Sequence, residues 1–326
     1  MKILVIKSSS MGDIIHALPV ARDIRKALPD ARIDWVAEES FRDIPRLAPD
    51  VDKIYCTAFR RWRKALFSSQ TRAEIASLRR ALREERYDAV LDIQGLIRSA
   101  VVAHWTGVPS IGYSRQTVRE PIASFFYKTK LDLPASLGAV RRYRMAAARA
   151  FGYEIDEEHP VFGLKPEAVP SFDIPPKSVA LCPNTSRDEK LWPEENWRAF
   201  GRRLQARGFV SVLYWGGPEE ERRCRRIAEG IPGAVVAPRA PLSQVAANLS
   251  CAAGVVGVDT GLAHLAAALG RPSVGIYVST PTEILKLVGD GPVRSLGGVG
   301  RVPTVDEVDA ALVQVMDAAR QDDSTD

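Results

Sequence analysis

Apolar positions occur along the chain in short runs that are separated by longer amphipathic stretches. The runs at 2–7, 179–182 and 255–258 contain few polar side chains and no alternation of polar and apolar residues. Strands of this kind are buried on both faces, as in a parallel sheet that carries helices on either side. The longer stretches have the spacing of amphipathic helices. The pattern therefore predicts the α/β class.

The order of these runs predicts two sheets. The first half contains expected strands at 2–7, 33–37, 53–56 and 89–93, with helices at 13–28 and 72–85. The second half contains expected strands at 179–182, 210–214, 235–236, 255–258 and 273–277, with helices at 193–207, 218–229, 242–250, 261–269 and 304–319. This alternation indicates two Rossmann-like, doubly wound parallel-sheet domains, which we expect to face a central cleft.

A proline-rich stretch separates the two halves. Residues 153–178 contain five prolines and show little periodicity, which is typical of a linker. We therefore expect an N-terminal domain at 1–155, a linker at 156–178, a C-terminal domain at 179–319 and a disordered tail at 320–326.

Charge is distributed unevenly between the halves. Residues 1–165 contain 28 lysines and arginines against 20 acidic residues, whereas residues 166–326 contain 17 against 20. The first half therefore suits an anionic partner: nucleic acid, an acidic membrane surface or a phosphorylated substrate. The sequence has neither a signal-peptide pattern nor an apolar run of about 18 residues, so we expect a cytoplasmic protein. Its four scattered cysteines predict neither a disulfide nor a zinc site.

Ligands of open parallel sheets bind beyond the carboxyl ends of the strands, so the loops that follow strands are the candidate sites. The first such loop, 7–13 (KSSSMGD), ends in Asp13. Two interpretations of this carboxylate stay open: it caps the next helix, or it acts as a general base toward a sugar hydroxyl. The loop matches neither a GxGxxG nor a Walker motif, which argues against a dinucleotide or ATPase site.

The loop at 183–193 offers groups that bind phosphate. Thr185 and Ser186 supply hydroxyl donors, and Lys190 supplies a compact positive charge that suits a departing phosphate. An ordinary solvated surface loop is the alternative interpretation.

The run at 254–264 passes from a buried strand directly into a helix. Backbone N–H groups at Thr260 and Gly261 would point out of the helix end, which predicts an anion site. His264 lies one turn later, on the same helix face as Thr260, and we interpret it as part of this site. The alternative is a histidine satisfied within the core.

Two further segments carry charge in a suggestive context. The acidic residues of 215–221 follow a strand, where they either complement the dipole of the next helix or bind ribose hydroxyls. The segment 59–67 combines four cations with aromatic residues, which fits either an anionic lipid surface or a solvated charged face. Asp50 and Asp52 form an Asp-x-Asp pattern, but they precede an expected strand, so we interpret them as a turn and not as metal ligands.

Eight segments resemble glycosyltransferase family 9, the lipopolysaccharide heptosyltransferases. They lie in order between residues 2 and 270: KSSSMGDIIHALP, DWVAEE, RRWRK, YDAVLDIQGLIRSA, REPIASFFY, SRDEKLWPEENW, WGGPEEE and VDTGLAHLAAAL. The first and third favour the first heptosyltransferase of the family over the second. The resemblance implies a GT-B fold whose N-terminal domain binds the acceptor and whose C-terminal domain binds the donor.

The resemblance also implies a reaction and its residues. An inverting transfer moves L-glycero-D-manno-heptose from ADP-heptose to Kdo of the lipid A inner core, with Asp13 as the base and without a metal or other cofactor. The implied donor-binding residues are Thr185, Ser186, Lys190, Glu220, Ala240, Asp259, Thr260, Gly261 and His264. The implied acceptor-binding residues are Arg60, Arg61, Arg63, Lys64 and Arg119.

The chain departs from the family pattern in two places. Ala240 stands where relatives often have methionine, so we expect any contact with adenine there to be through the backbone. Residues 277–280 (YVST) replace the common Tyr-Gly-Pro-Thr, which affects the expected shape of that loop.

The implied partners are ADP-heptose, Kdo-lipid A and the anionic inner-membrane surface. We expect a monomer on the cytoplasmic face of that membrane, with no nucleic-acid partner. Three alternatives stay open: heptosyltransferase II or another ADP-heptose transferase of the family, a sugar-nucleotide epimerase, and a non-catalytic peripheral membrane protein that binds nucleotide.

Overall fold

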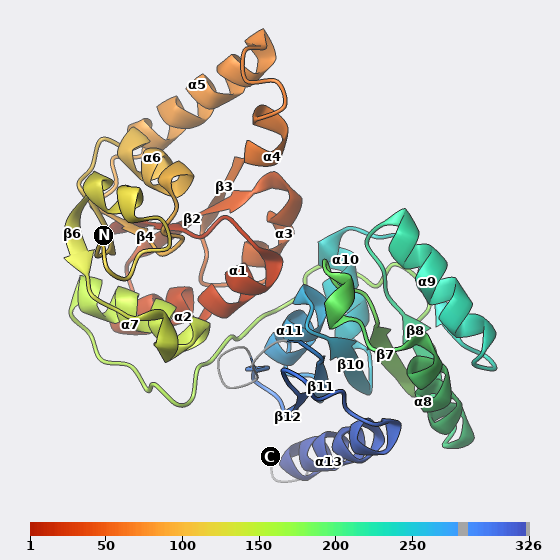
Figure 1. The fold of residues 1–326 in the computed structure, drawn as a ribbon. Coiled ribbons are helices and arrows are strands. Elements are labelled where there is room, and N and C mark those ends of the chain that lie inside the picture. The colour runs from red at the N-terminus through yellow and green to blue at the C-terminus, as the bar shows by residue number, and fades with distance from the viewer. Residues whose placement is uncertain (280–285, 324–326) are drawn as a thin grey trace. The chain divides into compact units, whose positions relative to one another are not determined.

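The computed structural model describes residues 1–279 and 286–323, which belong to two compact units. The units are Met1–Val161 and Phe162–Asp326 (Figure 1). Each unit is built on one six-stranded sheet, and neighbouring strands within each sheet run parallel. The predicted α/β class with two helix-covered parallel sheets is thus confirmed.

The first unit has the strand order β3-β2-β1-β4-β5-β6. Its strands are β1 (Lys2–Ile6), β2 (Arg32–Glu38), β3 (Lys53–Thr57), β4 (Ala89–Asp92), β5 (Ser110–Tyr113) and β6 (Tyr127–Leu131). Its α-helices are α1 (Met11–Ala17), α2 (Pro19–Ala27), α3 (Asp43–Arg46), α4 (Phe59–Trp62), α5 (Ser69–Glu84), α6 (Ile97–Trp105) and α7 (Ala139–Phe151). Its short 3-10 helices are η1 (Glu39–Phe41), η2 (Pro121–Phe126) and η3 (Ala135–Leu137).

The second unit repeats this topology with the order β12-β11-β10-β7-β8-β9. Its strands are β7 (Ser178–Cys182), β8 (Val210–Leu213), β9 (Val235–Val236), β10 (Gly254–Val258), β11 (Ser273–Tyr277) and β12 (Val293–Gly297). Its helices are η4 (Asp188–Lys190), α8 (Glu194–Ala206), α9 (Pro218–Glu229), α10 (Leu242–Ser250), α11 (Gly261–Ala268) and α13 (Val305–Asp323).

The order of strands reverses at one point in each sheet. In the first unit the chain moves outward from β1 to β3 and then returns to the other side of β1 with β4. In the second unit β7 and β10 are the corresponding neighbours. At such a point the connections after the two neighbouring strands cross opposite faces of the sheet. A crevice therefore forms beyond the carboxyl ends of these strands, and ligands bind there. The loops after β1, β4, β7 and β10 therefore border the candidate sites.

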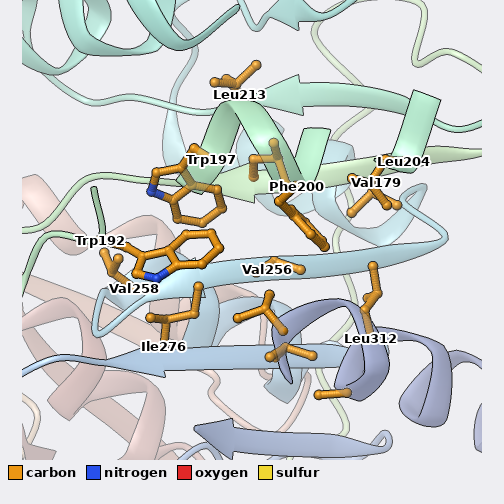
Figure 2. Close-up of a cluster of buried hydrophobic side chains, with 14 of the residues drawn as sticks. Val179, Trp192, Trp197, Phe200, Leu204, Leu213, Val256, Val258, Ile276 and Leu312 are labelled. Carbon is orange, nitrogen blue, oxygen red and sulfur yellow. The ribbon is translucent and has the colours of Figure 1, made fainter. Parts of the chain in front are cut away.

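Aromatic side chains fill the core of the second unit. Trp197, Phe200 and Leu204 lie on one face of α8 because their spacing follows the helical repeat. Trp192 packs edge-on against Trp197 with the ring centroids 5.0 Å apart, and Figure 2 shows the Trp192 ring between Trp197 and Ile276 of β11. This cluster fixes α8 on the sheet, and α8 follows the loop that carries Lys190.

Two expectations about helices are wrong. The helix expected at 13–28 is split into α1 and α2, because Pro19 has no N–H to continue the hydrogen bonding of α1 and instead begins the next helix. The tail expected to be disordered from 320 is helical up to Asp323, as the continuation of α13. Residues 324–326 lie outside the described residues.

The boundary between the units falls inside the expected linker of 156–178. Residues after Val161 belong to the second unit, where the backbone N–H groups of Phe162 and Gly163 donate to the carboxylate of Asp290. Farther along, the N–H of Ser171 donates to the side-chain oxygen of Asn248. The proline-rich stretch is therefore held along its second part by side chains of the second unit.

Replacing Phe200 with alanine tests this core, because the ring is completely buried. We expect the free energy of unfolding of the second unit to fall by about 3–5 kcal/mol, through lost contacts and the cavity left behind. Urea denaturation followed by circular dichroism measures it. Phe67→Ala is the matched control, since that ring is 88% exposed, and its effect should stay within about 0.5 kcal/mol. Equal effects of the two changes would contradict this account of the core.

Candidate active site

Asp13 lies in the first turn of α1, in the loop that follows β1. Its Oδ2 atom accepts hydrogen bonds from the backbone N–H of Ser10 at 3.0 Å and from the Ser10 hydroxyl at 2.8 Å. The hydroxyl of Tyr143, on α7, donates to Oδ1 at 3.3 Å. The side chain is 32% exposed. Asp13 therefore stabilises the start of the helix from its third position, while Ser10 is the N-cap, and its carboxylate remains accessible.

The ammonium group of Lys7 lies beside this carboxylate. Lys7 is buried, and its Nζ is 3.9 Å from Oδ1 of Asp13 and 4.7 Å from the ring centroid of Tyr143. Burial lowers the pKa of Lys7 to about 8, although the negative charges of Asp13 and Asp92 favour the protonated ammonium and act in the opposite direction. Burial alone would raise the pKa of Asp13, but the Lys7 ammonium and the hydrogen bonds from Ser10 hold it below its ordinary value. Asp13 is thus ionised at neutral pH.

A cavity of about 450 Å³ lies next to this pair in the first unit. Lys7, Arg119, Arg142 and Tyr143 line it, together with Tyr113. The guanidinium of Arg142 stacks 3.9 Å from the centre of the Tyr113 ring. The Tyr113 hydroxyl is buried and has no hydrogen-bond partner in the described part of the chain. Three cations and a hydroxyl with unused bonding capacity suit an anionic, hydroxylated ligand.

The loop after β4 holds in place the loop 7–13, which we name the reaction loop. The side-chain oxygen of Gln94 accepts hydrogen bonds from the backbone N–H groups of Ser8 and Ser9, at 3.0 and 3.1 Å. The buried carboxylate of Asp92 in turn accepts the N–H of Gln94 at 2.9 Å. Arg98, at the start of α6, donates to the hydroxyl of Ser9 at 2.9 Å. The loops after β1 and β4 are thus joined to each other by hydrogen bonds.

Sequence reasoning missed these supporting residues. Gln94 and Arg98 follow an expected buried strand. Their position alone could have marked them as candidates, because ligands bind beyond the carboxyl ends of such strands. Tyr143 carried no such signal, since it lies on α7, 130 positions from Asp13.

Arg61 of the basic segment is bound within the protein. Its guanidinium forms ion pairs with Glu39 at 3.0 Å and Glu74 at 2.9 Å. The indole N–H of the neighbouring Trp62 also donates to Glu74, at 2.7 Å. The hydrogen bonds that its guanidinium donates to Glu39 and Glu74 raise the pKa of Arg61 above its ordinary value. Arg61 therefore anchors α4 to its surroundings.

The other expected acceptor-binding cations are exposed. Arg60 stacks 5.1 Å from the ring centroid of Phe41, and Arg63 and Lys64 follow in the turn after α4. Arg119 is the expected acceptor residue that lines the cavity beside Lys7. The structure thus places Arg119 at the candidate site and the other three on the surface of the basic segment.

In the second unit, the loops after β7 and β10 meet. The ammonium of Lys190 forms an ion pair with Asp259 at 2.5 Å, and both side chains are largely buried. The hydroxyl of Thr185 donates to the backbone oxygen of Asp259 at 2.9 Å. Nε2 of His264 lies 3.8 Å from the Asp259 carboxylate. Four expected donor-binding residues are therefore within one cluster.

The amino end of α11 adjoins this cluster. Thr260 is the N-cap residue, in an extended conformation, and Gly261 is the first residue of the helix. The N–H groups of the first turn of a helix have no partner within the helix and attract anions. Ser186 is exposed, next to Thr185.

Glu220 lies in the first turn of α9, and Ala240 lies in the loop after β9. The Glu220 carboxylate accepts the backbone N–H of Gly216 at 2.7 Å, so it holds the loop between β8 and α9. Ala240 is half-buried. Nearby, the indole N–H of Trp215 donates to the backbone oxygen of Ala237 at 2.7 Å, which links the two loops. Sequence reasoning did not single out Trp215.

The loop after β11 departs from the family pattern, and the structure describes only part of it. Val278 and Ser279 are half-buried. Thr280 lies outside the described residues.

The Asp-x-Asp pattern forms a turn, as predicted. Asp52 accepts the backbone N–H of Ile33 at 2.7 Å and pairs with Arg25 at 2.8 Å, while Asp50 pairs with Arg22 at 3.4 Å. Across residues 1–279 and 286–323, no group of three or more His, Cys, Asp or Glu side chains is arranged to hold a metal ion. Within the same ranges, every helix is too short or too polar to cross a bilayer.

Known proteins are similar to this chain in sequence and in fold. The family model for glycosyltransferase family 9 (heptosyltransferase) matches residues 75–311. Lipopolysaccharide heptosyltransferase 1 of Escherichia coli (strain K12) is 41% identical over 290 residues, which are 87% of this chain and 90% of that protein. The structure described as E. coli heptosyltransferase WaaC with ADP superposes with a TM-score of 0.86 at 36% identity, over 96% of this chain and 98% of that chain.

A second structure, described as E. coli heptosyltransferase WaaC with ADP-2-deoxy-2-fluoro heptose, superposes with a TM-score of 0.78 at 36% identity, over the same shares of the two chains. These likenesses confirm the GT-B fold class that the resemblance implies. The matched segment runs from within α5 to within α13, over about half of the first unit and nearly all of the second, so the assignment does not depend on one motif. The chain belongs to glycosyltransferase family 9, the heptosyltransferase family.

Proposed function

We propose that this glycosyltransferase moves L-glycero-D-manno-heptose from ADP-heptose to Kdo of Kdo-lipid A, with inversion at the anomeric carbon. One observation carries the proposal: an ionised, accessible Asp13 carboxylate lies beside a cation-lined cavity in a heptosyltransferase-family chain. The likeness to a protein named heptosyltransferase 1, at 41% identity, supports the first heptosyltransferase over the second. The likeness to a structure with an ADP-heptose analogue supports the donor.

The donor binds to the second unit in this proposal. Its pyrophosphate accepts hydrogen bonds from Lys190, Thr185 and the first N–H groups of α11. Lys190 is already oriented by Asp259, so little side-chain freedom is lost when the phosphate arrives. The remaining donor contacts are proposed for Ser186 and His264, for Glu220 toward the ribose, and for the backbone at Ala240 toward the adenine.

The acceptor binds to the first unit. Arg119, with Lys7 and Arg142, receives the Kdo carboxylate in the cavity, because guanidinium groups match carboxylates with two hydrogen bonds. Arg60, Arg63 and Lys64 are exposed and contribute positive charge toward lipid A phosphates. The acceptor role of Arg61 stays a prediction that requires its release from Glu39 or Glu74.

The reaction is a single displacement. The Asp13 carboxylate accepts the proton of a Kdo hydroxyl while that oxygen attacks the anomeric carbon of the heptose. The bond from this carbon to the β-phosphate oxygen breaks, and ADP leaves with the electron pair. Lys190 and the amino end of α11 stabilise the charge that develops on the departing phosphate, which is the task a metal ion performs in other transferases.

Release of ADP with and without acceptor tests the function directly. We expect the wild-type chain to release ADP only when Kdo-lipid A is present, in buffer with or without EDTA. Asp13→Asn, which retains an oxygen for the Ser10 hydrogen bonds, should lower kcat by about 10²–10⁴-fold because the base is lost. Its ADP affinity, measured by calorimetry, should not change. Donor turnover without acceptor would indicate an epimerase, and no turnover at all would indicate a nucleotide-binding protein without activity.

The pH profile of Lys7→Met tests the electrostatics of the base. The wild-type rate should stay level from pH 5 to 7, because the pKa of Asp13 lies below its ordinary value. Without the ammonium, burial raises that pKa, so the rate of Lys7→Met should fall as the pH decreases over this range. The wild-type KM for acceptor should rise above pH 8, where Lys7 loses its proton, and the variant should lack this change. Lys177→Met, at an exposed lysine, is the control; identical profiles for all three would disprove the role of Lys7.

A reciprocal pair of substitutions tests the division of labour between the units. Lys190→Ala should weaken ADP binding by about 10–100-fold, the value of a charged hydrogen bond, and leave acceptor binding unchanged. Arg119→Ala should weaken acceptor binding by a similar factor and leave ADP binding unchanged. Calorimetry with ADP and with a deacylated acceptor measures both. The opposite pattern would overturn the assignment of donor and acceptor.

A further inference from the structure

Large apolar side chains are exposed together where η2 lies along α6. They are Ile97, Ile122, Phe125 and Phe126, which we name the η2 patch, and Phe125 is 70% and Ile122 58% exposed. The Glu120 carboxylate accepts the N–H of Ile97 at 2.7 Å, which joins the start of η2 to the start of α6. At the other end, the rings of His104 and Phe126 are in edge contact at 6.3 Å.

The backbone of η2 places these side chains outward. Ala123 and Ser124 of the same turn are buried, and the Ser124 hydroxyl donates to the backbone oxygen of Pro121 at 2.8 Å. The small residues therefore attach η2 to the unit, while the large apolar residues on either side of them face solvent. A core-directed 3-10 helix would show the reverse arrangement.

Cations surround the η2 patch. The guanidinium of Arg115 lies 5.8 Å from the centre of the Phe125 ring, and Arg98, Arg119 and Lys128 are exposed beside the patch in sequence. Between residues 97 and 128 the sole acidic residue is Glu120, whose carboxylate is bound to the start of α6. The patch is thus apolar at its centre and positive at its rim.

We propose that the η2 patch docks this protein on an anionic lipid bilayer, with Phe125 and Ile122 inserted among the acyl chains and the rim cations on the headgroups. Aromatic and aliphatic residues combined with arginine and lysine are the composition of segments that lie in the membrane interface. Anionic headgroups attract such cations, and the attraction is lost in high salt. The apolar centre distinguishes this surface from the basic segment 59–67, where positive charge predominates.

The position of the η2 patch connects docking to the candidate active site. Arg98 reaches from the patch to the Ser9 hydroxyl in the reaction loop, and Arg119 lines the cavity beside Lys7. In this respect the inference rests on the proposed function, because a lipid acceptor is anchored in the bilayer and its sugar must enter that cavity. Docking through this surface would hold the cavity within reach of headgroup sugars.

Co-sedimentation of the full chain with vesicles tests the proposal. We expect binding to vesicles of phosphatidylcholine with phosphatidylglycerol, and much weaker binding to phosphatidylcholine alone. The double substitution Ile122→Ser and Phe125→Ser should weaken binding to the anionic vesicles roughly tenfold, because two inserted apolar side chains are lost. Val169→Ser is the matched control, since that side chain is 73% exposed in the second unit.

Three outcomes would overturn the proposal. The first is absence of wild-type binding to the anionic vesicles, and the second is unchanged binding of the double variant. The third is a concentration-dependent dimer that the double substitution abolishes, because the η2 patch would then be a contact between copies of the chain. Phe67→Ser is assayed in parallel, and loss of binding in that variant alone would assign docking to the basic segment instead.

An assay of heptose transfer to a deacylated, water-soluble acceptor separates this proposal from the proposed function. The double variant should transfer at the wild-type rate in that assay, since neither Ile122 nor Phe125 lines the cavity beside Lys7. Failure of the wild-type chain to transfer heptose would refute the proposed function. The vesicle experiment would then still test membrane docking, because it does not depend on heptose transfer.

Discussion

The reversal of strand order beside β1 and beside β7 is the constraint on which the functional parts of this protein depend. At such a point, the connections after two adjacent strands run to opposite faces of the sheet. The loop after one strand therefore cannot pack against the connection that follows the other strand. Its backbone groups must find other partners. In the first unit Gln94 supplies them for Ser8 and Ser9, and in the second unit Thr185 bonds to the backbone of Asp259. The topology thus creates both the crevice and the need for the polar side chains that make it rigid.

Each unit places a lysine against an aspartate at this point, with different consequences. Lys7 is buried 3.9 Å from an Asp13 that remains partly exposed, so the pair keeps a carboxylate ionised and accessible. Lys190 and Asp259 are both largely buried in contact at 2.5 Å, so the carboxylate there mainly orients the lysine. The first arrangement suits removal of a proton, and the second suits neutralisation of a phosphate. Similar residues therefore acquire different roles from their relative burial.

The sequence predicts the parts of this fold that are governed by local pattern. Continuous apolar runs located β1, β7 and β10, and therefore the loops that carry Asp13, Lys190 and Thr260. Prediction from the sequence failed for elements and contacts that depend on packing between distant segments. The three central residues of the edge strand β6 (YKTKL) are exposed and two of them are lysines, so the segment gave no strand signal. Tyr143 reaches Asp13 from α7 through tertiary structure alone, and no spacing indicates this contact.

Net charge illustrates the same limit, because a sum of charges does not separate bound cations from available ones. Arg61 and Arg119 contribute equally to the positive first half. The structure binds Arg61 between Glu39 and Glu74 but places Arg119 in the cavity beside Lys7. The excess charge thus resolves into a cavity, an exposed basic segment and the rim of the η2 patch. The lipid acceptor that we propose would present carboxylates, phosphates and acyl chains to these three surfaces, so each surface has a counterpart in that one substrate.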